Sequence, residues 1–312
     1  MKILLHIFLI FFSIQSTYSQ SFNKDSVSIV AYWEKGDKVL YELEKIRKDI
    51  RNGSITKNTQ QSYIVSFEVI EQTDENYVLR YKYESVKGKD NNELEVVENM
   101  LGKLEYELLM SNTGEYLGLR NWQEIKAMTE KVTELFIDND KISAEEKKQM
   151  RAMMAGIFGS KEQIEALASK EIAFLFQLYG YTFATDSMMS YEEILPNAFG
   201  GDPFTGKATI VFQWLDAKKV KMENTLRLDP LKTRQTISQM IKKMMENAGK
   251  SGEEAEKEMS KMDYDINDEK FLIWDIETGW VEESKFYRKT IVKQGETTAI
   301  REDIIQFKRK RE

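Results

Sequence analysis

The 312-residue sequence contains no cysteine, and its one histidine, His6, lies close to the N-terminus. The rest of the chain therefore cannot form a Ser-His-Asp or Cys-His catalytic site, because both need an imidazole as the general base. Ordinary zinc, copper and haem sites are excluded in the same way, since their protein ligands are imidazoles and thiolates. We predict a non-enzyme with no catalytic residue, no metal site and no cofactor.

The first 19 residues have the three-part pattern of a secretory signal peptide. Lys2 supplies a positive charge, and the run from Ile3 to Ile14 is almost wholly apolar. Thr17 and Ser19 place small residues three before and one before a cut after Ser19. The apolar run is too short to cross a hydrocarbon core of about 30 Å as a helix. We predict cleavage after Ser19 and an exported, soluble mature chain, either periplasmic or secreted.

Positive charge is in the minority: 45 Lys and Arg face 52 Asp and Glu, for a formal net charge of −7. An acidic chain without a basic domain is not expected to bind nucleic acid. The C-terminal end differs, because Lys308, Arg309, Lys310 and Arg311 are consecutive cations. Such an end is ordinarily solvated. The alternative is peripheral contact with an anionic membrane, where each cation contributes up to about 1 kcal/mol.

Alternation of apolar and polar residues predicts antiparallel strands in several parts of the chain. Tyr63–Val69 and Tyr77–Tyr83 alternate on either side of a polar turn, and further hairpins are predicted at about 104–119, 208–228 and 271–307. A period of two indicates one buried and one solvent-exposed face, and short turns join neighbouring strands in antiparallel fashion. The pattern predicts a curved, open antiparallel sheet resembling half of a barrel.

Two helical excursions interrupt the strands, at about residues 121–179 and 230–262. Their apolar residues recur at spacings of three and four, which is typical of amphipathic helices. Three helix starts carry the spacing of a capping box: Asn121 and Glu124, Ser143 and Glu146, and Ser160 and Gln163. We predict an α+β fold class, in which one domain spans residues 20–312 and inserted amphipathic helices cover one face of the sheet.

The segment Gly201–Lys207 has the G-x-x-x-x-G-K spacing of a phosphate-binding loop. The next residue is Ala208 instead of a magnesium-binding serine or threonine. A phosphate loop must also open a helix, whereas residues 209–212 favour a strand. We interpret this segment as a turn between strands.

Three further segments resemble functional motifs in spacing only. The aspartate-rich stretches 138–140 and 263–268 lack the glycine and glutamate that an EF-hand calcium loop requires. Ser54–Lys57 has the S-x-x-K spacing of serine–lysine acyl transferases, but the partner motifs of those enzymes are missing. We interpret Ser54–Lys57 as a polar connection between strands.

Methionines gather on two of the predicted helices. With one phenylalanine they form a candidate site for an apolar ligand, here called the methionine set: Met150, Met153, Met154, Phe158, Met240, Met244 and Met245. The ordinary interpretation is core filling, because the unbranched methionine side chain packs irregular gaps. The functional interpretation is a deformable apolar groove between these helices and the sheet, able to accept varied hydrophobic ligands.

From about Val27 to Phe307 the order of predicted elements resembles the half-barrel carriers of Gram-negative envelopes of the LolA and LppX type. The resemblance is one of architecture and contains no diagnostic motif, so no site residue is transferred. Such carriers hold acyl chains in an apolar cavity. The resemblance implies an exported binding protein that carries or senses a lipid or other apolar ligand. A non-enzymatic envelope interaction or structural protein is the alternative, and a hydrolase with paired carboxylates is a more remote one.

Overall fold

The computed structural model describes residues 25–87, 104–137, 143–168, 170–195, 197, 201–247, 252, 256–257, 259 and 261–311. The predicted signal peptide, residues 1–19, lies outside these ranges, so its cleavage stays a prediction. The aspartate-rich stretch 138–140 also lies outside them. Within the described ranges, no helix is both long and apolar enough to cross a membrane.

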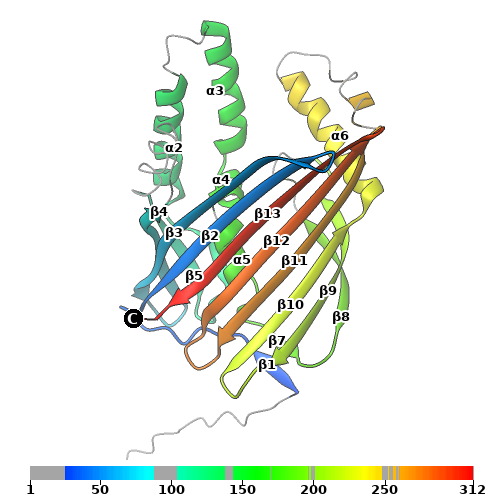
Figure 1. Cartoon of the computed structure of the whole chain (residues 1–312). Helices are drawn as coiled ribbons and strands as arrows, with labels where there is room; N and C mark the ends of the chain where they lie inside the picture. The colour runs from blue at the N-terminus through cyan, green and yellow to red at the C-terminus, as the bar shows by residue number, and fades with distance from the viewer. Residues whose placement is uncertain are drawn as a thin grey trace, which may run out of the picture.

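An open, curved antiparallel sheet of eleven strands forms most of the described fold (Figure 1). Its strand order is β6-β5-β4-β3-β2-β13-β12-β11-β10-β9-β8. Most neighbours are consecutive in sequence, but at the centre β13 pairs with β2. The predicted α+β fold class with an open antiparallel sheet is confirmed. The strands are β2 (Lys38–Arg51), β3 (Ser54–Gln72), β4 (Asn76–Lys87), β5 (Glu105–Ser111), β6 (Tyr116–Leu119), β8 (Met189–Leu195), β9 (Phe204–Trp214), β10 (Lys219–Leu228), β11 (Asp263–Asp275), β12 (Trp280–Gln294) and β13 (Thr297–Lys310).

Strands β2 and β3 are longer than predicted, because a two-residue turn at Asn52 and Gly53 joins them directly. Both residues have positive φ, 49° and 80°, which suits the Asn-Gly turn of a tight hairpin. The interpretation of Ser54–Lys57 as a polar connection is therefore wrong: it is the start of β3. Both faces of β3 are solvent-exposed over these residues, so they lack the apolar alternation that marks a half-buried strand.

The N-terminal described segment runs from a pairing with β7 (Thr182–Ala184) to the hydrophobic core. It begins with β1 (Ser26–Ser28), which makes this pairing. The Ile29 amide then donates to the Tyr181 carbonyl, and the Ala31 amide to the Thr113 carbonyl. These hydrogen bonds lead the chain to Trp33, which is buried in the core.

Five described helices accompany the sheet. They are α2 (Trp122–Ile137), α3 (Ala144–Phe158), α4 (Lys161–Ala168), α5 (Lys170–Phe176) and α6 (Pro230–Asn247). Helix α5 lies on the face of the sheet that we call the inner face, while α2 and α3 extend beyond the sheet (Figure 1). At the start of α3 the Ser143 hydroxyl accepts from the Glu146 amide, and the Glu146 carboxylate accepts from the Ser143 amide. Ser160 and Gln163 make the same reciprocal pair before α4. These two predicted capping boxes are confirmed.

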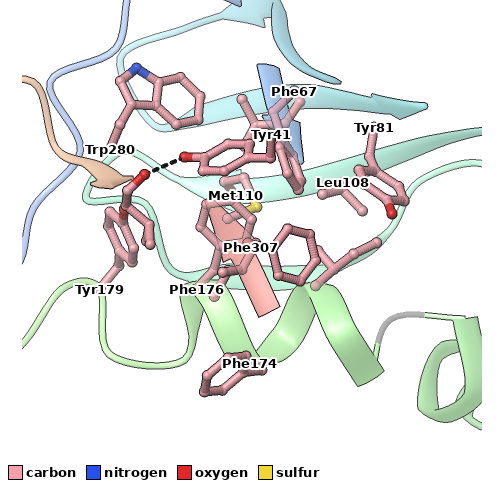
Figure 2. Packing of buried hydrophobic residues seen from close by; sticks show 14 of the residues in the cluster. Tyr41, Phe67, Tyr81, Leu108, Met110, Phe174, Phe176, Tyr179, Trp280 and Phe307 are labelled. Atoms are coloured by element: carbon pink, nitrogen blue, oxygen red, sulfur yellow. Dashed lines mark hydrogen bonds between the residues drawn. The ribbon is translucent and has the colours of Figure 1, made fainter. Parts of the chain in front are cut away.

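The main hydrophobic core packs α5 and the N-terminal segment against the inner face (Figure 2). Trp33 stacks on Trp280 with ring centroids 4.6 Å apart, and Phe67 of β3 meets Phe176 of α5 at 5.5 Å. The buried Tyr41 hydroxyl donates to the Val281 carbonyl at 2.7 Å. Burial raises the pKa of Tyr41, so this tyrosine stays a neutral donor. Large aromatic side chains therefore fill this part of the inner face.

Candidate binding face

The inner face continues beyond the aromatic core, toward the Asn52–Gly53 end of the central strands. Residues directly opposite each other in an antiparallel sheet share a face, so the strand register identifies which side chains lie there. Across β11, β12, β13 and β2 they form three rows, which together we call the distal inner face. The rows are Lys270, Phe286, Ile305 and Lys45; Asp268, Arg288, Asp303 and Arg47; and Ile266, Thr290, Arg301 and Asp49.

The distal inner face is neither packed like the core nor fully open to water. Phe286 and Asp268 are buried, with exposed fractions of 9% and 2%. Arg301 is exposed, and the other nine members are half-buried. The ring centroids of Phe286 and of Phe174 in α5 are 6.0 Å apart, so Phe286 connects this face to the aromatic core. A partly covered surface of mixed polarity therefore borders directly on a filled core.

Paired charges occupy the middle and outer rows. Arg288 donates to both carboxylate oxygens of Asp268, each at 2.6 Å. This bidentate pair fixes the guanidinium and the carboxylate relative to each other. Arg301 donates to Asp49 at 2.9 Å, and Arg47 approaches the same carboxylate at 3.4 Å. The hydrogen bond from Arg301 lowers the pKa of Asp49. Two of the three acids on this face are therefore already engaged by arginines.

The row nearest the core carries two lysines in different settings. The Lys45 ammonium lies 5.3 Å from the centre of the Tyr63 ring and donates to the Tyr83 hydroxyl at 3.4 Å. Burial lowers the pKa of Lys270, while attraction to Asp268 and Glu193 opposes the shift. No carboxylate among the described residues makes an ion pair with the Lys270 ammonium. Lys270 is thus a half-buried cation without a direct counterion.

The three rows contain five cations and three acids, an excess of two positive charges, whereas the whole chain has a net charge of −7. The cations come from four strands. The sequence analysis did not single these residues out. A signal was present in the stretch Lys45, Arg47 and Asp49, where charged residues take over the period-two positions occupied by Tyr41 and Leu43.

The structure places the methionine set on two helices that stand apart (Figure 1). α3 packs on α2 and α4, whereas α6 packs on β9 and β11. Four members are half-buried: Met150 and Met154 on α3, and Met240 and Met245 on α6. Met153, Phe158 and Met244 lie in the same helices, but their side chains are outside the described part of the structure. The two clusters are not brought together, and the ligand-binding role of the set stays a prediction.

The four C-terminal cations are not a uniformly solvated end. Lys308, Arg309 and Lys310 are the last residues of β13. Arg309 and Arg311 both donate to the largely buried carboxylate of Glu282, at 2.9 and 2.7 Å. Two of the four charges are therefore compensated within the fold, and membrane contact stays a prediction.

The described residues contain no cluster of three or more acidic side chains placed to hold a metal ion. No protein-family model matches the sequence, and no curated protein matches it. Among solved structures, the chain is similar to lipovitellin, in a structure concerned with lipid–protein interactions, with 10% identity and a TM-score of 0.41. The match covers 89% of this chain and 25% of the lipovitellin chain, so this chain spans about a quarter of that protein's length.

Proposed function

We propose that the protein is an exported binding protein that carries or senses a lipid-like molecule on its distal inner face. The observation that supports this is the half-buried state of the face, which joins apolar side chains to charged ones on a rigid sheet. Ile305 and Ile266, which are both half-buried, supply the apolar part, and Phe286 beside Ile305 is buried against Phe174. Binding sites of this kind are typically concave and mainly apolar, with a few placed polar groups.

The aromatic core directs the ligand to the distal part of the inner face. Trp33, Tyr41, Phe67 and Phe307 are each at most 1% exposed, so their own side chains occupy the volume next to α5. The distal face still has surface to bury. Each methylene group of a ligand that leaves water there contributes about 0.8 kcal/mol. A chain lying against Ile305 could therefore bind without displacing the core.

The export part of the proposal is supported by the signal-like pattern that ends at Ser19. A chain without cysteine needs no disulfide chemistry outside the cytoplasm, because a core of this size can be stable without cross-links. Intact-mass measurement of the exported protein tests it, with a mature N-terminus at Gln20 as the expected result. Retention of residues 1–19 in the exported protein would refute it.

A second candidate is an interaction or structural role, and it is favoured by the outer face of the same strands. Two rows of apolar residues lie there, Ile46, Ile304 and Tyr287 in one and Ile55, Ile50, Ile300 and Ile291 in the other. Ile55 is 59% exposed, and the remaining six are half-buried. A charged row of Lys48, Glu302 and Lys289 separates the two apolar rows, and apolar surface bordered by polar residues commonly marks a contact site.

Two adjacent residues of β13 separate the candidates experimentally. Ile305 points to the inner face and Ile304 to the outer face, and both are half-buried. The full chain would be purified from a membrane-bearing host, and bound lipid measured by native mass spectrometry and by fluorescent fatty-acid titration. We expect Ile305→Glu to lose lipid and probe binding, and Ile304→Glu to keep both. Absence of copurified lipid and of probe binding in the parent protein would overturn the carrier proposal.

A further inference from the structure

Lys270 is a half-buried cation of the distal inner face that has no ion-pair partner among the described residues. The neighbouring acid Asp268 uses both carboxylate oxygens for Arg288 at 2.6 Å. Asp49 is engaged by Arg301 and Arg47. Glu193 attracts Lys270 only at a distance beyond that of an ion pair. A half-buried ammonium without a counterion is unfavourable, because burial removes water that the fold does not replace.

The position of Lys270 is the boundary between the filled core and the charged rows. In the sheet it lies between Asn224 of β10 and Phe286 of β12. The Asn224 amide donates to the Thr209 carbonyl at 3.0 Å and to the Tyr191 hydroxyl at 3.1 Å, so both of its amide hydrogens are used within the protein. On the other side, Phe286 is buried against Phe174, and the half-buried Ile305 next to it offers apolar surface. A charged group and an apolar chain can thus be bound next to each other.

We infer that the molecule bound on the distal inner face is an amphiphile with an anionic head group, a carboxylate or a phosphate, and that Lys270 pairs with this head. The inference rests on the carrier function proposed above and names the chemistry of its ligand. The excess of positive charge on this face, in an otherwise acidic protein, favours an anionic ligand over a neutral one. The apolar part of the ligand lies along the half-buried Ile305.

The test compares ligands that differ only in head-group charge. Binding of hexadecanoate and of hexadecanol would be measured by displacement of a fluorescent fatty-acid probe from the full chain. Because a hydrogen-bonded charge pair forms with only one of them, we expect hexadecanoate to bind about tenfold more tightly. Hexadecyl phosphate should bind like hexadecanoate if the site recognises the charge rather than the carboxylate shape. Acetate and inorganic phosphate, which lack the chain, should not displace the probe.

Two variants assign the effect to one side chain. Lys270→Met should bind hexadecanoate no better than hexadecanol, while Lys270→Arg should keep the preference. Lys289→Met is the matched control, because Lys289 lies on the outer face of β12 and should leave the preference unchanged. Thermal unfolding of each variant confirms that it is folded.

Each other outcome has a distinct meaning. Equal binding of hexadecanoate and hexadecanol would overturn the anionic-head inference and leave the carrier proposal standing. A preference that survives in Lys270→Met would overturn the assignment to Lys270. Displacement by acetate or phosphate alone would show that the site binds small anions. Failure of all amphiphiles to bind, with no copurified lipid, would overturn the carrier proposal itself.

Discussion

The near and far halves of the central strands carry opposite polarity on the same face. In β2, Tyr41 and Leu43 point inward and are buried, with Glu42 and Glu44 on the outer side. Two residues further along, Lys45 and Arg47 occupy the inward positions and Ile46 lies outside. In β13 the inward positions change from Phe307 and Ile305 to Asp303 and Arg301 toward the far end. The near half buries apolar area and stabilises the fold, whereas the far half leaves a charged, half-buried inner surface.

The largest expected effect comes from the near half. Phe67→Ala removes a fully buried ring that contacts Tyr41, Tyr81 and Phe176. We expect the free energy of unfolding to fall by about 3–5 kcal/mol, from lost burial and the cavity left behind. Urea denaturation monitored by circular dichroism measures it. Ile304→Ala, on the half-exposed outer face, is the comparison and should cost about 1 kcal/mol. Equal losses would contradict the division into two halves.

The buried ion pair of the far half should come next. Arg288→Met leaves Asp268, which is 2% exposed, without its partner. We expect a loss of about 3 kcal/mol in unfolding free energy, because an uncompensated carboxylate is held out of water. The double variant Arg288→Met with Asp268→Leu should recover to within about 1 kcal/mol of the parent protein. A double variant no more stable than Arg288→Met would show that the pair is needed for more than charge balance.

The outer row should contribute much less. Arg301→Gln removes an ion pair with Asp49 in which the arginine side chain is 48% exposed, so we expect a loss of about 0.2–1 kcal/mol at neutral pH. Arg301 lowers the pKa of Asp49. A lowered acid pKa stabilises the fold above the ordinary pKa of the group, and this contribution is lost as the pH falls through the folded-state pKa. The parent and variant curves should therefore converge in acid, which unfolding series between pH 7 and pH 2.5 would reveal.

The smallest expected change in stability is a gain instead of a loss. Lys270→Met replaces a half-buried ammonium with an apolar side chain of similar length, and should raise the melting temperature by less than about 3 °C at neutral pH. Because the folded-state pKa of Lys270 is lowered, the unfolded chain binds more protons just below the ordinary lysine pKa. Stability of the parent protein should rise with pH in that window, and the advantage of the variant should shrink. Calorimetry from pH 7 to pH 10 tests this, and a lower melting temperature in the variant would contradict it.

The fold class could be predicted because its signals are local. The apolar alternation of Tyr63–Val69 and the capping pair Ser143 and Glu146 each involve a few neighbouring residues. The first segment lies within β3 and the second begins α3. The full length of β2 could not be read from apolar alternation, because its inward positions turn from apolar to charged at Lys45. The pairing of β2 with β13 joins segments that are far apart in the sequence, so no local pattern indicates it.

The candidate site was harder to predict, because it arises from register. Asp268, Arg288, Asp303 and Arg47 belong to four strands, and become neighbours only when those strands are aligned. In the sequence they are ordinary charged residues in a chain rich in charge. The methionine set was predicted from the composition of two helices. Composition does not show that α3 and α6 pack against different elements.

The seam between β2 and β13 also sets conditions on folding. β13 is the last described strand, yet it sits in the middle of the sheet, between β2 and β12. Until it is in place, β2 and β12 each expose an unpaired edge, which is a template for aggregation. Contacts between such distant segments also form slowly. A chain cut after Gln294 would lack β13, so we expect two separate half-sheets, each with an unpaired edge that is prone to aggregation. Premature termination late in synthesis should therefore be as damaging as loss of the core.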